Sequence, residues 1–372
     1  MDFNFSDDQQ SLRDATAKWV ERGYTFERRR AIVEKEGGFS QQAWNEMAEL
    51  GLTGLYVPEA DGGLGLGPVD GMVVMEELGR GLVMEPLAQS LIAGATLAKY
   101  ADAQLRAAWQ PRIASGQALV VLAQQEAGNR YRLDRSATRV AVNGSQVRVD
   151  GVKTLVPAGD KATAYLVPGM AGDQLVLALV DAASPDGGAR GFGCPDGSRA
   201  AEVTFRGAAG TLVAAAGLEA LEWAVDVGIA ATCAEGVGVM DKTFDLTAEY
   251  LNTRKQFGVL IGSFQALRHR LADMKMALEL ARSMSYYASL KLGAPLDERR
   301  RAMARAKYQL GVSMRFVGQQ SVQLHGGIGV TDEYVGSHYF KRLTQMETVF
   351  GDTLHHLGEV SARMQDTAGV FA

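Results

Sequence analysis

Two short segments of this chain hold residues whose types and spacing could do chemistry. Arg254, Gln256 and Phe257 stand close together in RKQFG, and HGGIGV covers residues 325–330. A glycine-rich segment lets backbone groups approach a ligand closely, although it can also simply turn the chain. The basic and aromatic cluster has a local explanation as well: cations favour a helix C-terminus, and Gly258 can end the helix.

We do not expect a metal site. Only two cysteines occur, Cys194 and Cys233, and neither has the pairing or the histidine spacing of a zinc site. His355 and His356 lack a set of further ligands, so we expect this pair at the surface or at an interface. Two cysteines cannot brace a disulfide scaffold, which favours a reducing cytoplasm.

Length and composition describe a globular chain of two or three domains. It has 372 residues, of which 47% are hydrophobic and 22% charged, as in ordinary globular proteins. Acidic residues outnumber basic ones by 43 to 38, for a net charge of −5. A mildly acidic chain without a long basic run is a poor match to nucleic acid or anionic membranes. No run of about 18 apolar residues occurs, so we expect no membrane span.

The elements that must position these motifs follow in the order helix, strand, helix. Residues 1–117 have helical patterns, whereas 118–212 contain short alternating runs, with Asn143-Gly144 as a hairpin signal. Residues 213–372 return to helix. We therefore predict an α+β chain of several domains, with a β-barrel or sandwich between two α-helical domains. Without βαβ alternation or a GxGxxG motif, a Rossmann domain is not expected.

The order and spacing of the motifs resemble the acyl-CoA dehydrogenase family from end to end. The motifs that carry the resemblance are GLTGLYVPEADGGLGLGPVDGMVVMEELGRG, VDGVKTLVPAGDKATAYLV, YLNTRKQFGVLIGSFQALRHRLADM and QLHGGIGVTDEY. The resemblance implies that family's fold, in which the C-terminal domain is a four-helix bundle. It also implies that FAD is bound between the β domain and the C-terminal helices, partly across a subunit interface.

The resemblance implies roles in FAD binding for eight residues. Arg254 and Phe257 would contact the dinucleotide of a neighbouring subunit, and the fork of an arginine suits a pyrophosphate. Gln265 would hold the adenosine side. The other implied FAD-binding residues are Gln256, Gln323, Gly326, Gly327 and Thr353.

The reaction implied is α,β-desaturation of an acyl-CoA substrate, in which a glutamate removes the α-proton. Here the chain departs from the family, because the usual base position is Gly351 and the position used by a second subgroup is Gly228. Asp352 is the candidate catalytic base, with an N-cap of the last helix as the alternative. Two other possible substitutes lie near Gly228: Glu235, seven residues after it, and Asp226, two residues before it.

The β-domain motifs also depart from the family pattern. Gln125–Arg130 replaces its usual Thr-Glu-Pro and Gly-Ser-Asp stretch, and Leu155-Val156-Pro157 replaces an aromatic stretch beside the flavin. Proline removes an amide that could donate a hydrogen bond. This pattern resembles the small subunit of pimeloyl-CoA dehydrogenases and the hetero-oligomeric acyl-CoA dehydrogenases of steroid side-chain degradation.

Three interpretations remain open. The chain is a homo-oligomeric dehydrogenase that uses Asp352, or a subunit of a hetero-oligomer in which a sister chain supplies the glutamate, or a flavin-free scaffold of the same fold. An electron-transfer flavoprotein is the expected electron acceptor of the first two, with oxygen, as in an oxidase, as the alternative. The sequence does not identify the acyl group of the substrate.

Overall fold

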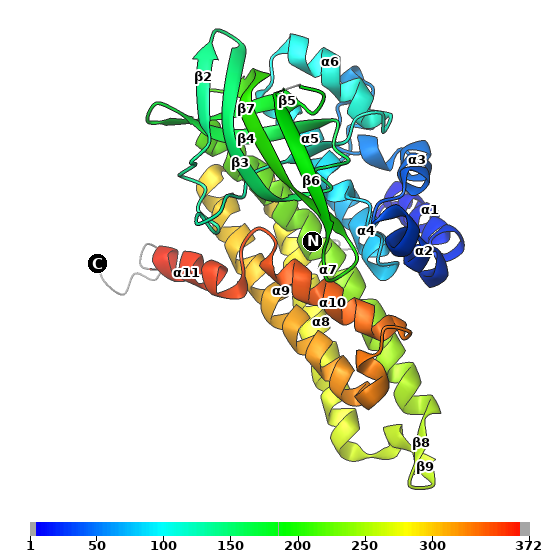
Figure 1. Cartoon of the computed structure of the whole chain (residues 1–372). Coiled ribbons are helices and arrows are strands. Elements are labelled where there is room, and N and C mark those ends of the chain that lie inside the picture. Colours follow the sequence, from blue (N-terminus) through cyan, green and yellow to red (C-terminus); the bar gives the residue numbers. More distant parts are fainter. Residues whose placement is uncertain (1–4, 185, 365–372) are drawn as a thin grey trace. The chain divides into compact units, whose positions relative to one another are not determined.

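The computed structural model describes residues 5–184 and 186–364 and divides the chain into two compact units. The first unit comprises residues 1–29, 72–83 and 229–372, and the second comprises 30–71 and 84–228. The α-helices (Figure 1) are α1 (Asp7–Gly23), α2 (Phe26–Glu36), α3 (Gln41–Glu49), α4 (Pro68–Arg80), α5 (Leu87–Tyr100), α6 (Ala103–Ala114), α7 (Gly217–Thr253), α8 (Gln265–Lys291), α9 (Leu296–His325), α10 (Val335–Thr348) and α11 (Thr353–Met364). The strands are β1 (Val120–Leu122), β2 (Arg139–Asn143), β3 (Gln146–Pro157), β4 (Ala164–Ala171), β5 (Gln174–Asp181), β6 (Gly187–Gly193), β7 (Arg199–Ala214), β8 (Lys255–Gln256) and β9 (Val259–Leu260).

The N-terminal helices begin where capping residues allow it. Ser6 and Gln9 form a capping box: Ser6 Oγ accepts from Gln9 N at 3.2 Å, and Gln9 Oε1 accepts from Ser6 N at 3.1 Å. Such a box satisfies two backbone donors that a helix start leaves free. At the start of α3, Ser40 Oγ accepts from Ala43 N as a simple N-cap. The helix α2 was not predicted, because FERRRAIVEKE has few apolar residues at a helical spacing.

The second unit contains a closed sheet. β2 and β3 form the predicted hairpin, with Asn143 opposite Gln146 and Gly144 at φ +63° in the turn. β5 pairs with both β4 and β7, so the path β4–β2–β3–β7–β5 returns to β4 as a small barrel. Its core is built from buried valine, alanine and aromatic side chains, most of them on these strands.

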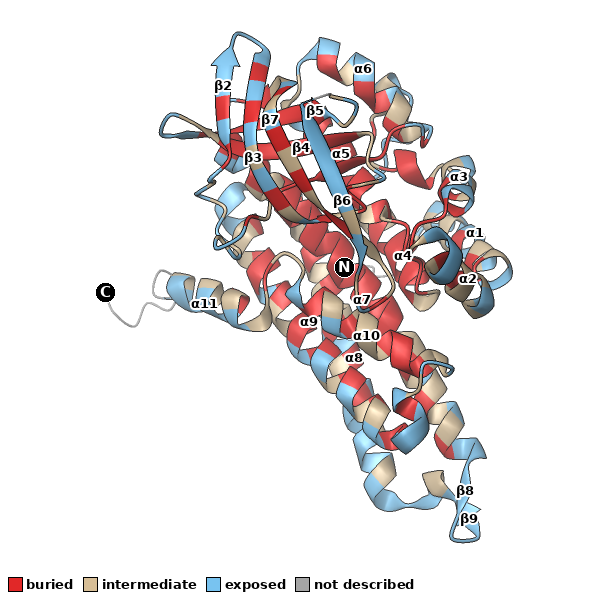
Figure 2. Ribbon diagram, in the orientation of Figure 1, coloured by how far each residue is buried: buried red, intermediate tan, exposed pale blue. Residues whose placement is uncertain are grey.

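The first unit is built on long helices. α8 and α9 lie side by side, and the β8–β9 hairpin projects from the far end of α7 (Figure 1). α7 is buried along most of its length, whereas the hairpin is exposed (Figure 2). By length and composition α7 could cross a membrane, yet 94% of its most apolar window is buried inside the protein, as in a core helix.

Candidate functional site

The structure brings the two sequence motifs to the same end of the long helices. Arg254 follows α7 directly, and its backbone N–H donates to Tyr250 O at 2.9 Å. The ring of His325, the last residue of α9, packs on the ring of Tyr250 at 4.6 Å between centroids. One turn earlier, the hydroxyls of Thr247 and Ser321 share a hydrogen bond of 2.9 Å. These contacts place RKQFG and HGGIG beside each other.

The residues of this end remain accessible to a ligand. Phe257 is 90% exposed, and within the described residues Arg254 forms no ion pair. A side chain at Gly326 or Gly327 would meet no atom within 4 Å, so the backbone there faces open space. Gln256, Gln265 and Gln323 are exposed as well. An unpaired guanidinium, an exposed aromatic ring and open glycine backbone fit a phosphate-bearing dinucleotide.

Thr353 lies elsewhere in the same unit. Its hydroxyl donates to Glu347 Oε1 at 2.5 Å and its backbone N–H donates to the same oxygen at 2.9 Å. The missing side chain of Gly311 on α9 makes room for the Thr353 hydroxyl. Gly311 lies 12 residues before Gln323, which is about 18 Å along a helix. One chain therefore carries two separate groups of predicted FAD-binding residues.

The loop at the predicted base position is closed around a glycine. Gly351 has φ +116°, and a Cβ there would lie 2.5 Å from His356 Nε2 and 2.6 Å from His355 Cδ2. Burial lowers the pKa of His356 to about 2, so its imidazole is neutral and its Nε2–H donates to Phe350 O at 3.0 Å. The expectation that this pair lies at the surface or at an interface was wrong for His356, which is buried inside the chain because α11 turns its ring toward the loop.

The carboxylates proposed as substitute bases have structural partners. Asp352 Oδ1 accepts from His355 N at 2.7 Å, the contact of an N-cap on α11. Glu235 is buried and accepts from Arg342 Nε at 2.7 Å. Asp226 is fully buried on α7. The geometry at Asp352 supports the N-cap alternative, and catalysis by this residue stays a prediction.

Lys307 lies beneath this loop and was not singled out in the sequence. Its Nζ donates to three backbone carbonyls of residues 346–351. A signal was present, because Met303, Lys307, Leu310 and Met314 recur at the 3–4-residue spacing of the apolar face of α9. A lysine on the apolar face of a helix is buried, so its ammonium group needs hydrogen-bond acceptors inside the protein.

A buried ion pair holds Glu126, which lies in the 125–130 segment of the β-barrel unit. Lys153 Nζ donates to Glu126 Oε1 at 2.7 Å, and the same carboxylate accepts from Ser136 Oγ, Ala137 N and Thr138 N. Although burial raises the pKa of Glu126, the Lys153 ammonium and these donors lower it to about 2. Burial lowers the pKa of Lys153 to about 8. Glu126 therefore holds the barrel together as a structural residue.

β3 presents an irregular segment beside this pair. Its pairing with β7 shifts register between Lys153 and Val156, and Leu155 there has φ +51° and is 53% exposed. A non-glycine residue in the left-handed region is uncommon and clusters at ligand sites. The segment that departs from the family pattern is thus a strained bulge with an exposed apolar side chain.

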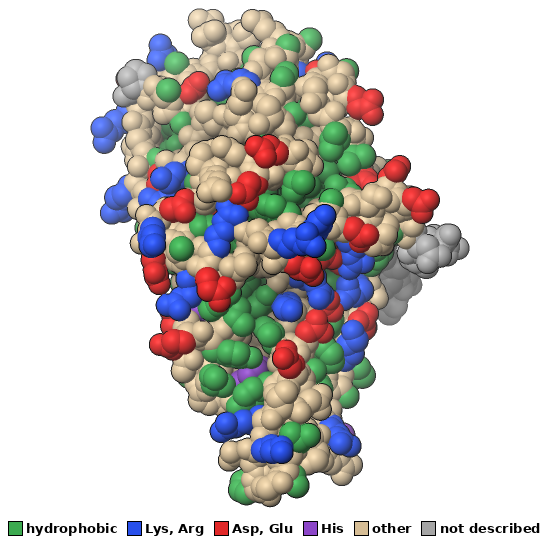
Figure 3. Space-filling view, turned by 90° about the vertical axis from the view of Figure 1, so that its right-hand side faces the viewer, with side chains coloured by type: hydrophobic (Ala, Val, Ile, Leu, Met, Phe, Trp, Pro, Cys, Tyr) green, Lys and Arg blue, Asp and Glu red, His purple; other side chains and the backbone are tan. Residues whose placement is uncertain are grey.

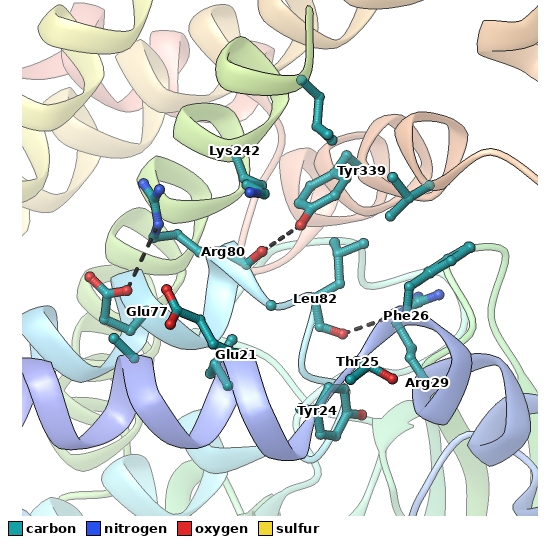
Figure 4. A pocket seen from close by; sticks show the side chains of 15 residues that line it. Glu21, Tyr24, Thr25, Phe26, Arg29, Glu77, Arg80, Leu82, Lys242 and Tyr339 are labelled. Carbon is teal, nitrogen blue, oxygen red and sulfur yellow. Dashed lines mark hydrogen bonds and ion pairs between the residues drawn. The ribbon is translucent and has the colours of Figure 1, made fainter. Parts of the chain in front are cut away.

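A cavity of about 320 Å³ lies in the first unit, away from these residues. Lys242 and Tyr339 face it from α7 and α10, and Arg29 donates to Leu82 O at 3.1 Å (Figure 4). None of the predicted FAD-binding residues lines it. Within residues 5–184 and 186–364, no three His, Cys, Asp or Glu side chains gather as metal ligands. On the face in Figure 3, basic and acidic side chains are interspersed rather than gathered into one field.

The chain is similar to known proteins in both of its helical parts. Residues 6–117 match the N-terminal domain of acyl-CoA dehydrogenases, and residues 215–365 match their C-terminal domain. Acyl-CoA dehydrogenase IpdE2 of Mycobacterium tuberculosis is 30% identical over 339 residues, covering 90% of this chain and 91% of the relative. Acyl-CoA dehydrogenase FadE27 of the same organism is 25% identical over 379 residues, covering 99% and 100%.

Solved structures are similar along the whole chain. A variant of the Tcur3481–Tcur3483 steroid ACAD superposes with a TM-score of 0.90 at 28% identity, covering 97% of this chain and 99% of that one. The ChsE4–ChsE5 complex from Mycobacterium tuberculosis superposes with a TM-score of 0.90 at 26% identity, covering 99% and 100%. With both domain matches, a 30% identical relative and these structures, the chain belongs to the acyl-CoA dehydrogenase family.

Proposed function

We propose that this chain is one subunit of a hetero-oligomeric, FAD-dependent dehydrogenase that desaturates an acyl-CoA thioester between its α and β carbons. A sister chain of the same fold supplies the carboxylate that removes the α-proton. One observation carries this proposal: position 351, where the resemblance places the base, is a glycine, and the rings of His355 and His356 occupy the space that a side chain there would need. The capping contact of Asp352 and the ion pair of Glu235 support it further.

FAD is the cofactor of the family, and when bound it accepts the hydride from the β-carbon. We assign Arg254 and Phe257 to the FAD of a neighbouring subunit, with the guanidinium on the pyrophosphate. Gln256 and Gln265 extend the same surface toward the adenosine side. The amides at Gly326 and Gly327 approach the dinucleotide because open space surrounds them. Gln323 and Thr353 complete the assignment.

The two groups of residues suit a shared site. The groups at Gln323 and at Thr353 lie about 18 Å apart along α9, so they serve either different ends of one long cofactor or cofactors of different subunits. The relatives are consistent with a two-chain assembly, since one similar structure is the ChsE4–ChsE5 complex. Electrons then pass to an electron-transfer flavoprotein, and the enzyme works in the cytoplasm, where Cys194 and Cys233 need no disulfide.

The test is to produce the chain alone and together with a homologous acyl-CoA dehydrogenase chain that retains a base glutamate. We expect the pair to copurify, to bind FAD and to oxidise acyl-CoA with an artificial electron acceptor. The lone chain should be inactive. Full activity of the lone chain would support the homo-oligomer with Asp352 instead, and a pair without FAD would support the scaffold.

A further inference from the structure

One buried lysine holds the loop between α10 and α11. Lys307 on α9 is 1% exposed. Its Nζ donates to the carbonyl oxygens of Glu347 and Gly351 at 2.9 Å each, and to that of Met346 at 3.2 Å. An ammonium has three N–H donors, so these three acceptors use all of them. Within the described residues Lys307 forms no ion pair.

The acceptors tie the end of a helix to the loop. Met346 and Glu347 lie in the last turn of α10, where carbonyls lack the usual partners four residues on. Met346 O also accepts from Val349 N at 3.3 Å. A cation at a helix C-terminus is also favoured by the helix dipole. Gly351 lies beyond the helix end, so Lys307 fixes how far the loop can move from α10.

A second anchor acts from the other side of the loop. His356 on α11 donates its Nε2–H to Phe350 O at 3.0 Å. Between the two anchors, Phe350 has φ +57° and Gly351 has φ +116°. The left-handed conformation is costly for a non-glycine residue such as Phe350, and it persists only where the surrounding contacts impose it. Lys307 and His356 supply those contacts.

We propose that Lys307 is the positioning residue of this loop, and that Lys307 and His356 hold it in a form that only glycine at position 351 fits. A side chain there would begin 2.5 Å from His356 Nε2 and 2.6 Å from His355 Cδ2. His355 is half-buried, whereas His356 is buried and would lose its bond to Phe350 O. The missing base is therefore built into the loop, and Gly351→Glu alone does not supply one.

The loop geometry can be measured without any activity, and only the role of position 351 as a base position rests on the proposed function. The loop is tested by hydrogen–deuterium exchange on the full chain, with its partner where one copurifies, and without substrate. The informative amides are those of Thr353, His355 and His356, which are bonded to Glu347 and Asp352. A failed loop test and a failed activity test are thus distinguishable.

The key variant is Lys307→Met, which keeps the length of the side chain and removes its donors. We expect at least about tenfold faster exchange at those three amides, with recovery in Lys307→Arg. Lys153→Met is the matched control, since Lys153 is also buried and donates to Pro168 O; it should loosen residues 126–138 and leave 349–356 unchanged. Unchanged exchange at 353–356 in Lys307→Met would overturn the proposal. If that variant does not fold, Lys307→Gln, which retains two donors, gives the same comparison.

The requirement for glycine at position 351 is tested with a double-mutant cycle of Gly351→Ala and Lys307→Met. Gly351→Ala should lower the melting temperature strongly in the wild-type background and less in Lys307→Met, because neighbouring sites that share a constraint are not additive. Gly358→Ala is the control, since Gly358 on α11 has open space around its Cβ; its effect should be the same in both backgrounds. Additive effects of Gly351→Ala and Lys307→Met would overturn the shared constraint.

A pH profile separates positioning from simple packing. Burial lowers the pKa of Lys307 to about 8, so above that pH one of its three donors is lost. Glu347 and Asp352 also face Lys307, while Cys233, with a pKa raised by burial to about 12, and His356 stay neutral from pH 7 to 9. Protection of the 353–356 amides should fall above about pH 8 in the wild type and stay level in Lys307→Arg. A level profile in the wild type would contradict the role of the ammonium.

Discussion

Arg342 of α10 donates its Nε–H to Glu235 Oε1 of α7 across 2.7 Å, and its Nη2 donates to the same carboxylate oxygen. Glu235 is buried, so this pair replaces the water that its carboxylate would otherwise need. A carboxylate held by an arginine is a poor proton acceptor, because the positive charge favours its ionised form. The pair therefore joins two helices of the first unit.

Glu235→Gln should lower the free energy of unfolding and leave the turnover of the assembled enzyme unchanged. Loss of a charged hydrogen bond costs about 1.5–3 kcal/mol, measured as the free energy of unfolding in urea. Glu249→Gln is the control, because Glu249 lies on the same helix, is exposed and forms no ion pair in the described chain. Lost turnover in the assembled enzyme without lost stability would restore Glu235 as a catalytic candidate.

Asp352→Asn should leave turnover of the assembled pair at the wild-type level. Asparagine caps helices as well as aspartate, so the bond from His355 N survives. Asp352→Ala should cost about 1 kcal/mol of stability through the lost cap. A drop of about 10²–10⁴-fold in the rate of Asp352→Asn, with FAD content unchanged, would instead identify Asp352 as the base.

Arg254→Ala should lower FAD affinity by tenfold or more, since a charged hydrogen bond to phosphate contributes about 1.5–3 kcal/mol. Arg254 is exposed and forms no ion pair in the described chain, so the stability of the isolated chain should not change. FAD content and oligomer mass are measured together, because the site is proposed to span an interface. Arg305→Ala, at another exposed arginine of the same unit, is the control. Equal FAD content in both variants would reject the assignment.

The Glu126–Lys153 pair predicts acid sensitivity of the second unit. The pKa of Glu126 is lowered to about 2 in the folded chain, so its stabilisation is complete above about pH 4.5 and disappears as the pH falls from there toward 2. A loss on the order of 2–3 kcal/mol is expected across this window. Glu126→Gln should remove most of this dependence and destabilise the unit at pH 7, because Lys153 is then buried without its partner.

The check is exchange of the 126–138 amides as a function of pH. Glu202→Gln, which breaks a more exposed pair with Arg190 at 3.5 Å, should change little. An acid dependence that persists in Glu126→Gln would show that other carboxylates dominate it.

Local signals in the sequence predicted the helix–strand–helix order and the family, although they did not predict α2. The capping box at Ser6 and the hairpin at Asn143-Gly144 predicted their structures correctly, because both depend on hydrogen bonds between residues a few positions apart. The helix–strand–helix order and the motifs at 254–258 and 325–330 pointed to the acyl-CoA dehydrogenase family, which the comparisons confirm.

Only the tertiary structure decided what the side chains of the base loop do. The sequence shows that position 351 is glycine, yet the closure of its space by His355 and His356 depends on how α11 packs beside α9. Lys307 meets Gly351 O across 44 positions of the chain, and Arg342 meets Glu235 across 107. Such contacts are set by helix packing, which no short-range pattern encodes. For this reason the sequence did not reveal that Glu235 forms an ion pair, or that Lys307 holds the loop.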